Sequence, residues 1–144
     1  MKNKKMMFGL VFSLLLLSSC KNIKNTVTMS ELKGEWNIVE VNRQEVSANP
    51  LPFIGFDTEE KRIYGNSGCN RIMGGFRLSN KNDKIELEEI AGTMMACPDM
   101  ELETNVLKAL SEASRIRHGD EEDEIILSDK SGNPVILLKK KTHE

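Results

Sequence analysis

The sequence contains few of the side chains from which catalytic and metal sites are built. It has only two histidines, His118 and His143, and three cysteines, which are not in Cys-x-x-Cys spacing. A structural zinc site needs about four such ligands, and its cysteines commonly occur in that spacing. The chain also lacks a phosphate-binding glycine loop and the Gly-x-Ser-x-Gly motif of a serine nucleophile. We therefore expect no metal, no cofactor and no enzymatic activity.

One enzymatic alternative stays open. His118 could serve as a base that is oriented by Asp120 or Glu121, with Ser67 as the nucleophile of a hydrolase. No recognised spacing links these residues. An exposed histidine at a strand end beside an acidic turn is the preferred interpretation of His118.

Long hydrophobic runs are missing except near the N-terminus. Met6–Leu17 is a stretch of twelve uncharged residues that follows three lysines. As a helix it would span about 18 Å, which is too short to cross a hydrocarbon core of about 30 Å. A basic start followed by a short apolar run is typical of a secretory signal peptide.

This segment ends in Leu17-Ser18-Ser19-Cys20, which resembles the lipobox of bacterial lipoproteins. In such proteins the chain is cut before the cysteine, which then carries the lipid. We expect residues 1–19 to be the signal peptide, Cys20 the lipidated membrane anchor and residues 20–29 a flexible tether. Ordinary signal cleavage beside an incidental cysteine is the alternative. No acidic run follows the anchor, which favours the periplasmic face of the outer membrane.

An excess of positive charge is absent. The chain has 20 Lys and Arg against 22 Asp and Glu; loss of residues 1–19 with their three lysines leaves 17 against 22, a formal charge of −5. Nucleic-acid binding depends on neutralising phosphates, so we expect no nucleic-acid partner. Lys139–Lys141 is interpreted as a solvated strand end, with contact to anionic lipid headgroups as the alternative. Residues 30–141 suffice for one compact domain, which we expect to be monomeric.

Cysteine is scarce, but its number is informative. If Cys20 carries lipid, an even pair remains, Cys69 and Cys97. In an exported protein such a pair is most simply a disulfide, although two free thiols or a redox or metal role remain open.

A glycine-rich stretch, Gly65–Phe76, organises the rest of the chain. Its glycines predict a strand that bends sharply at Cys69 and restarts. Around it, short runs rich in β-forming residues predict strands at Glu35–Val41, Phe53–Asp57, Lys61–Tyr64, Gly75–Leu78, Lys84–Glu88, Arg115–His118, Glu124–Leu127 and Val135–Leu138. Between 42 and 52 the chain is expected to form a loop.

One amphipathic helix is predicted after Cys97, with Pro98 at its first position. Its apolar face is expected to consist of Leu102, Val106, Leu107, Leu110 and Ala113. Glu101 and Glu103 are interpreted as solvated charges of its first turn, and Asn70 as a side chain that bonds the local backbone at the bend. The pattern is that of an α+β domain.

At this point the chain resembles the META domain family, which includes the bacterial heat-shock protein HslJ. The resemblance covers roughly Leu32–Leu138 and rests on Gly65, Asn66, Gly68, Cys69, Asn70, Gly74, Thr93, Met95, Cys97 and an acidic residue, Glu101 or Glu103. Ile72 replaces the aromatic residue that is common in the family. The resemblance implies a curved antiparallel sheet or broken β-barrel of about seven or eight short strands, packed on one helix. The implied fold is similar to that of lipoprotein pilots of the MxiM type, whose cracked barrel can hold an acyl chain. The resemblance implies no catalytic residues.

The leading functional hypothesis is a non-enzymatic envelope lipoprotein, related to stress, that binds or supports outer-membrane or secretion proteins. The alternative is a carrier of a small apolar ligand, such as an acyl chain, in the barrel interior. Met73, Phe76, Met94 and Met95 are the residues expected to line that interior.

Overall fold

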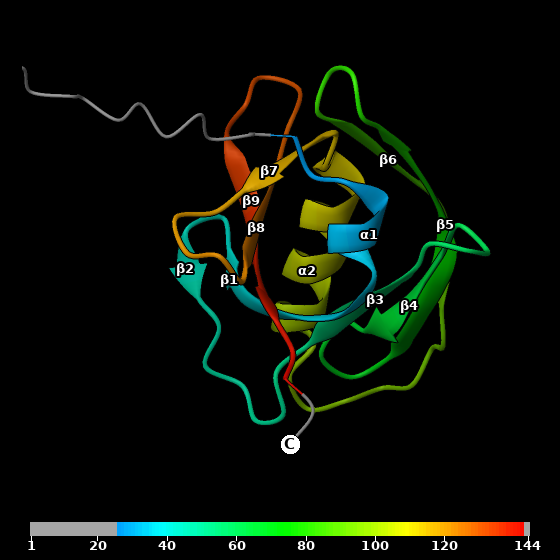
Figure 1. Ribbon diagram of the computed structural model, residues 1–144. Helices are drawn as coiled ribbons and strands as arrows, with labels where there is room; N and C mark the ends of the chain where they lie inside the picture. The colour runs from blue at the N-terminus through cyan, green and yellow to red at the C-terminus, as the bar shows by residue number, and fades with distance from the viewer. Residues whose placement is uncertain (1–25, 143–144) are drawn as a thin grey trace, which may run out of the picture.

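The computed structural model describes residues 26–142 (Figure 1). The expected signal peptide and the lipidation site at Cys20 lie outside this range. The elements, in chain order, are α1 (Met29–Leu32), β1 (Gly34–Val41), β2 (Gln44–Glu45), β3 (Phe53–Asp57), β4 (Arg62–Asn66), β5 (Arg71–Ser79), β6 (Lys84–Gly92), α2 (Glu101–Glu112), β7 (Arg115–His118), β8 (Glu124–Ser128) and β9 (Pro134–Lys140). Within the described part of the chain, neither helix has the length and apolar character needed to span a membrane.

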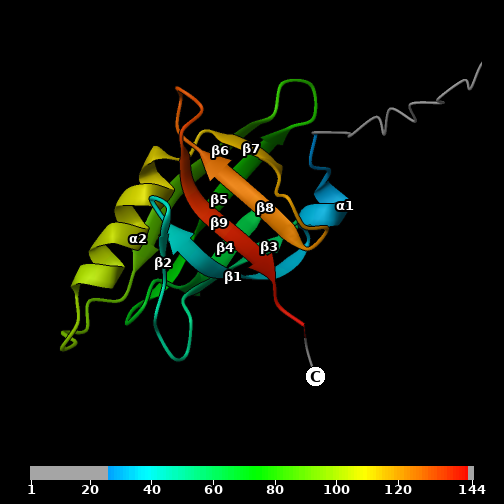
Figure 2. The same cartoon turned by 90° about the vertical axis from the view of Figure 1, so that its left-hand side faces the viewer.

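The strands form one antiparallel sheet that curves into a broken barrel, which confirms the predicted α+β fold. The strand order is β2-β1-β3-β4-β5-β6-β7-β8-β9, and β1 also pairs with β9 to bring the two ends of the sheet together. Residues that alternate along the strands point inward, as Trp36 and Ile38 do in β1, and are almost fully buried. Figure 2 shows β8 and β9 crossing in front of β3, β4 and β5.

The ring is weakest between β6 and β7, whose pairing is limited to Lys84 with Arg115. Helix α2 lies at one end of the barrel and α1 at the other (Figures 1 and 2), and α2 buries Val106, Ala109 and Leu110. This confirms most of the predicted apolar face and adds Ala109 to it. The helix packs against β1 and β9 and covers this end of the barrel.

Several predicted boundaries were wrong. Helix α2 begins at Glu101, with Met100 as its N-cap, so Pro98 lies in the preceding loop. Strand β5 begins at Arg71 and runs through the two glycines at 74 and 75, because the ladder with β4 continues across them. The bend itself lies over residues 67–70, which confirms the predicted bend at Cys69.

The folded domain also begins earlier than the predicted tether allows. Val27 is 1% exposed and belongs to the core. Thr28 is the N-cap of α1 and forms a capping box with Glu31. The predicted loop over 42–52 contains the short strand β2, which pairs with β1.

Candidate functional site

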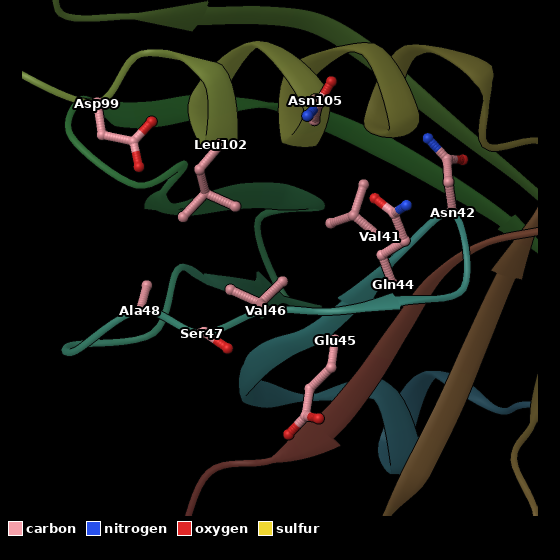
Figure 3. Close-up of a pocket in the computed structure, with 10 residues that line it drawn as sticks. All are labelled: Val41, Asn42, Gln44, Glu45, Val46, Ser47, Ala48, Asp99, Leu102 and Asn105. Carbon is pink, nitrogen blue, oxygen red and sulfur yellow. The ribbon is translucent and has the colours of Figure 1, made fainter.

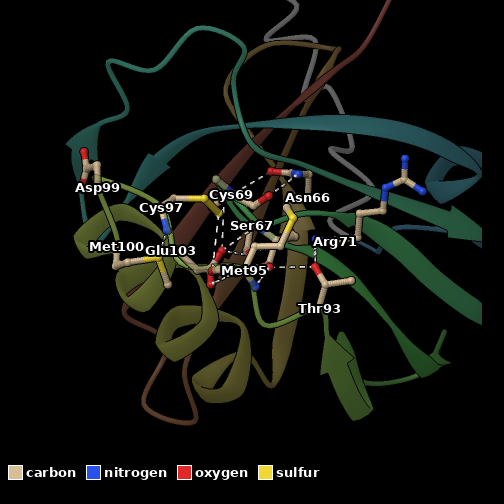
Figure 4. Close-up of a disulfide and its surroundings, with 12 residues drawn as sticks. Asn66, Ser67, Cys69, Arg71, Thr93, Met95, Cys97, Asp99, Met100 and Glu103 are labelled. Carbon is tan, nitrogen blue, oxygen red and sulfur yellow. Dashed lines mark hydrogen bonds between the residues drawn. A yellow bond between two sulfur atoms is a disulfide. The ribbon is translucent and has the colours of Figure 1, made fainter.

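A carboxylate, Glu103, is buried in the first turn of α2, with only 5% of its surface exposed. Its Oε2 accepts hydrogen bonds from the Asn70 amide at 2.7 Å, the Ser67 hydroxyl at 3.1 Å and the Cys69 amide at 3.3 Å. Its Oε1 accepts a bond from Asn70 Nδ2 at 2.8 Å. Figure 4 shows Glu103 close to Ser67 and Cys69. The prediction that Glu103 is a solvated charge was therefore wrong.

The Asn70 side chain connects this carboxylate to a segment 25 residues further along. Its Oδ1 accepts hydrogen bonds from the Met95 amide at 2.7 Å and the Thr93 hydroxyl at 2.7 Å, and its Nδ2 donates to the Met95 carbonyl at 3.0 Å. The prediction that the Asn70 side chain bonds the local backbone at the bend was wrong, because its partners are Thr93, Met95 and Glu103. Together, Ser67, Asn70, Thr93 and Glu103 form what we call the Glu103 cluster.

Local sequence explains how the turn over 67–70 presents its amides to Glu103. Asn66 Oδ1 accepts a bond from the Gly68 amide at 2.8 Å, and Asn66 Nδ2 donates to the Cys69 carbonyl at 3.3 Å. Gly68 has a φ of +132°, a conformation that favours glycine because a side chain would be strained there. The turn therefore directs the Cys69 and Asn70 amides to one side, where the carboxylate lies.

These donors determine the ionisation of Glu103. Burial alone would raise its pKa, but hydrogen bonds from the Asn70 side chain, the Asn70 amide, Ser67 and Cys69 favour the carboxylate. The balance lowers the pKa of Glu103 below its ordinary value of 4.5. Glu103 is therefore charged at neutral pH.

A disulfide joins Cys69 in the turn to Cys97, which precedes α2. Their Cα atoms are 6.2 Å apart, and Figure 4 shows the bond beside Ser67 and Glu103. This agrees with the disulfide that the cysteine count favoured. It fastens the 93–100 segment, which has no helix or strand of its own, to the sheet.

An open groove of about 560 Å³ lies between the end of β6 and α2. Its lining is mainly apolar and comes from Ser67, Asn70, Ile72, Ile90, Ala91, Gly92, Thr93, Met94, Met95, Ala96, Met100, Glu103 and Leu107. Met94 and Met95 are 97% and 56% exposed at its edge. We call this feature the β6–α2 groove, and its volume lies within the range of about 300–1,000 Å³ that is typical of ligand sites.

The groove is not the barrel interior that the sequence indicated. Phe76 lies in the core at 1% exposure. Its ring packs edge-to-face against that of Phe56, with 5.2 Å between the ring centres. Met73 lies on the outer surface at 62% exposure and does not line the groove. Only Met94 and Met95 of the four predicted lining residues reach a pocket.

A second, smaller pocket of about 250 Å³ lies between β2 and α2 (Figure 3). It is lined by Val41, Asn42, Gln44, Glu45, Val46, Ser47, Ala48, Asp99, Leu102 and Asn105. Polar side chains and backbone surround most of it. It contains none of the residues predicted for the site.

The residues of the enzymatic alternative lie in different places. Ser67 is fully buried and bonded to Glu103. His118 lines another pocket with Trp36 and Lys140, and its Nε2 is 3.9 Å from a Glu31 carboxylate oxygen. Among residues 26–142, no group of three or more His, Cys, Asp or Glu side chains is placed to hold a metal ion.

The three C-terminal lysines lie at the end of β9, as predicted, and Lys139 is exposed, but Lys140 and Lys141 are partly buried and make specific contacts. Lys140 Nζ lies 4.3 Å from the centre of the Trp36 ring and donates to the Lys33 carbonyl. Lys141 Nζ bonds Glu35 at 2.8 Å, and Lys139 Nζ lies 3.8 Å from Asp123. Burial lowers the pKa of Lys140.

The sequence profile of the META domain matches residues 28–142. The chain belongs to the META domain family. A comparison of the chain with curated proteins found no match.

Three solved structures resemble this META domain. An NMR structure of a protein from Burkholderia xenovorans is 21% identical with a TM-score of 0.63, covering 80% of this chain and 87% of that chain. A second NMR structure is 24% identical with a TM-score of 0.59, and the match covers 78% of this chain and 94% of that chain. A crystal structure of a DUF4847 family protein from Bacteroides vulgatus is 14% identical with a TM-score of 0.55, and the match covers 78% of this chain and 96% of that chain. At these identities the likeness concerns the fold.

The structure places most of the predicted motif residues of this META domain around the Glu103 cluster. Asn66, Gly68, Cys69 and Asn70 form the turn or flank it, and Thr93, Met95 and Cys97 lie on the segment that the turn holds. Gly65 is a buried position of β4, paired with Ile72 and Ile54. An added Cβ at Gly74 would lie 2.6 Å from the Glu88 carbonyl oxygen, so β5 and β6 approach closely there.

Glu101 does not belong to the cluster. Its side chain is exposed, whereas Glu103, the other candidate for the acidic motif residue, makes the contacts with Ser67, Cys69 and Asn70. The sequence contains a signal that could have found this, because Glu103 is three residues before Val106 and seven before Leu110, which places it on the apolar face of the helix.

Proposed function

We propose that this META domain is a non-enzymatic binding module of the bacterial envelope, tethered to a membrane through Cys20. The observation that carries the proposal is the β6–α2 groove, which is open and apolar beside a rigid polar cluster. The signal-like N-terminus and the lipobox-like Leu17-Ser18-Ser19-Cys20 supply the expected location. The proposed partners are outer-membrane or secretion proteins, which the module would bind under stress.

The test is affinity capture of the full chain from its own envelope, with identification of retained proteins. Ala91→Trp places a large side chain at an exposed groove position, and Asn82→Trp makes the same change in the turn before β6, away from the groove. We expect Ala91→Trp to lose retained partners and Asn82→Trp to keep them. Identical capture by both variants would contradict a role for the groove.

A separate variant, Cys20→Ser, tests the tether. We expect the unaltered chain to fractionate with membranes and Cys20→Ser to be released from them. Membrane association that is unchanged in Cys20→Ser would contradict anchoring at this residue.

A second candidate function is the carriage of a small apolar ligand such as an acyl chain. The observation that favours it is the apolar lining and the volume of the groove, since the barrel interior is filled by core side chains. A fluorescent fatty acid should bind the unaltered chain and Asn82→Trp with equal affinity, and Ala91→Trp at least about tenfold more weakly. Binding that is unaffected by Ala91→Trp would contradict this site.

A further inference from the structure

One edge of β6 has no strand partner over most of its length. The last contacts with the β7 side are bonds from the Ile85 amide to the Ser114 carbonyl at 3.2 Å and from the Ile116 amide to the Asp83 carbonyl at 2.9 Å. Beyond this point β6 pairs with β5 alone among the described residues, with an irregularity in the ladder at Glu89 and Ile90. In an antiparallel ladder, alternate residues face the same side, so Leu87 presents its amide and carbonyl to the open edge as Ile85 does. Such an edge can accept another extended chain.

The β6–α2 groove lies directly beside the end of this open edge. Ile90, Ala91 and Gly92 of β6 form one wall, and Leu107 of α2 contributes to the other. Because alternate side chains of a strand point to opposite faces, a chain added to β6 could place every second side chain in the groove.

The segment from Ile85 to Leu107, which forms the open edge and most of the groove, carries charge of one sign. Between Ile85 and Leu107 the chain carries six acidic residues and no Lys, Arg or His. Arg77 pairs with Glu86 and Glu88, and Glu103 is held in its cluster. This leaves Glu89 and Glu101 as exposed carboxylates, with Asp99 nearby in sequence.

We propose that the open edge of β6 and the β6–α2 groove together bind an extended peptide segment of a partner protein, with alternating apolar and basic residues. Its backbone adds a strand to β6, its apolar side chains enter the groove, and its basic side chains face the acidic rim. The proposal rests on the binding function proposed above and names the class of partner. The acidic rim disfavours a fatty acid, whose carboxylate carries the same sign.

The site needs little rearrangement to bind. The 93–100 segment is fixed at Met95 by the Asn70 side chain and at Cys97 by the disulfide. A preformed site loses less conformational freedom on binding than a flexible one.

The test uses the full chain in phospholipid nanodiscs and three blocked six-residue peptides. The first alternates lysine with valine, the second replaces lysine by glutamate, and the third is the first with the strand-facing amides N-methylated. Calorimetry gives the dissociation constants, and amide hydrogen exchange locates the contact. We expect the lysine peptide to bind at least about tenfold more tightly than either of the others, and to slow exchange of the Leu87 amide.

Two charge variants test the rim. Glu89→Lys combined with Glu101→Lys reverses both exposed carboxylates, whereas Glu60→Lys makes one such change in the turn between β3 and β4. Affinity for the lysine peptide should fall at least about fivefold in the double variant and stay unchanged in Glu60→Lys. A thermal unfolding midpoint is measured for each variant, so that loss of binding is separated from loss of folding.

Equal binding of the lysine and glutamate peptides, no effect of N-methylation, or protection away from β6 would each overturn the inference. If groove-dependent envelope proteins are captured but the lysine peptide does not bind, this inference fails and the proposed function stands. If neither is retained, both fail.

Discussion

Glu103 shows how a single buried charge can be stabilised by neutral donors. Burial raises the free energy of the ionised carboxylate, but two backbone amides, one side-chain amide and one hydroxyl point at it. Because all four donors are arranged around one group, removal of that group leaves them without a protein acceptor.

Replacement of Glu103 by alanine is therefore expected to be costly. Glu103→Ala should lower the free energy of unfolding by about 3 kcal/mol, since buried donors lose a charged partner. Glu101→Ala, two residues earlier and exposed, is the matched control and should change it by less than about 0.5 kcal/mol. Urea denaturation measures both. Similar midpoints for the two variants would show that the cluster does not support the fold.

Acid should weaken the fold through the same residue. Folding lowers the pKa of Glu103 below 4.5, so the unfolded chain takes up a proton at a higher pH than the folded chain does. The stabilisation is complete above the unfolded pKa and is lost as the pH falls through the folded value. We expect the urea midpoint to fall as the pH is lowered from neutral through the unfolded and then the folded pKa of Glu103, and to fall less in Glu103→Gln. Parallel curves for the two proteins would contradict this origin.

At the scale of elements, the 93–100 segment depends on contacts from elsewhere. It has no helix or strand, and almost all of its residues are exposed. The Asn70 side chain and the disulfide hold it against the turn over 67–70. The groove wall formed by Met94 and Met95 therefore depends on these two connections.

Removal of the disulfide tests this dependence. The bond joins residues 28 positions apart, and a loop of that length is expected to contribute about 3–4 kcal/mol through the unfolded state. Cys69→Ala combined with Cys97→Ala should lower the free energy of unfolding by roughly that amount and speed amide exchange over 93–100. Unchanged exchange in this segment would mean that Asn70 alone is sufficient to hold it.

Helix α2 contributes to the core as well as to the groove. Leu110 is fully buried beneath the curved sheet, whereas Lys108 is exposed. Leu110→Ala should lower the free energy of unfolding by about 2–5 kcal/mol, and Lys108→Ala by less than about 0.5 kcal/mol. Chemical denaturation of both variants gives the comparison. A small effect at Leu110 would contradict the packing of α2 against the core.

The sequence predicted the elements better than their tertiary contacts. The helix was identified from apolar residues at helical spacing, and most strands from β-forming runs, because these are local signals. Strand β2 was missed because two residues carry no periodicity. The roles of Asn70 and Glu103 depend on residues that are 25 and 33 positions from Asn70, and no local pattern encodes such contacts.

At the scale of the whole molecule, the domain begins before the position that polarity indicated. Val27 lies in the core, and Thr28 caps α1, although the surrounding sequence is polar. Polarity alone therefore placed the boundary too late. The short β-forming runs did predict the antiparallel strands of an α+β domain, whereas the curvature of the sheet was expected only from the resemblance to the META domain family.

This boundary can be tested with two shortened chains. A chain that starts at residue 30 lacks the buried Val27 and the Thr28 cap, whereas a chain that starts at residue 26 keeps both. The shorter chain should be less stable by about 2–4 kcal/mol, as judged from urea midpoints. Equal midpoints would place the start of the domain after α1.

The pairing of β1 with β9 also determines when the domain can fold. Ile38 lies opposite Leu138, and Trp36 opposite Lys140, so a strand made early in synthesis waits for one at the far end of the domain. A nascent chain has β1 without this neighbour until residue 140 has emerged. Completion of the barrel is therefore a late event in the folding of the domain, because such distant contacts form slowly.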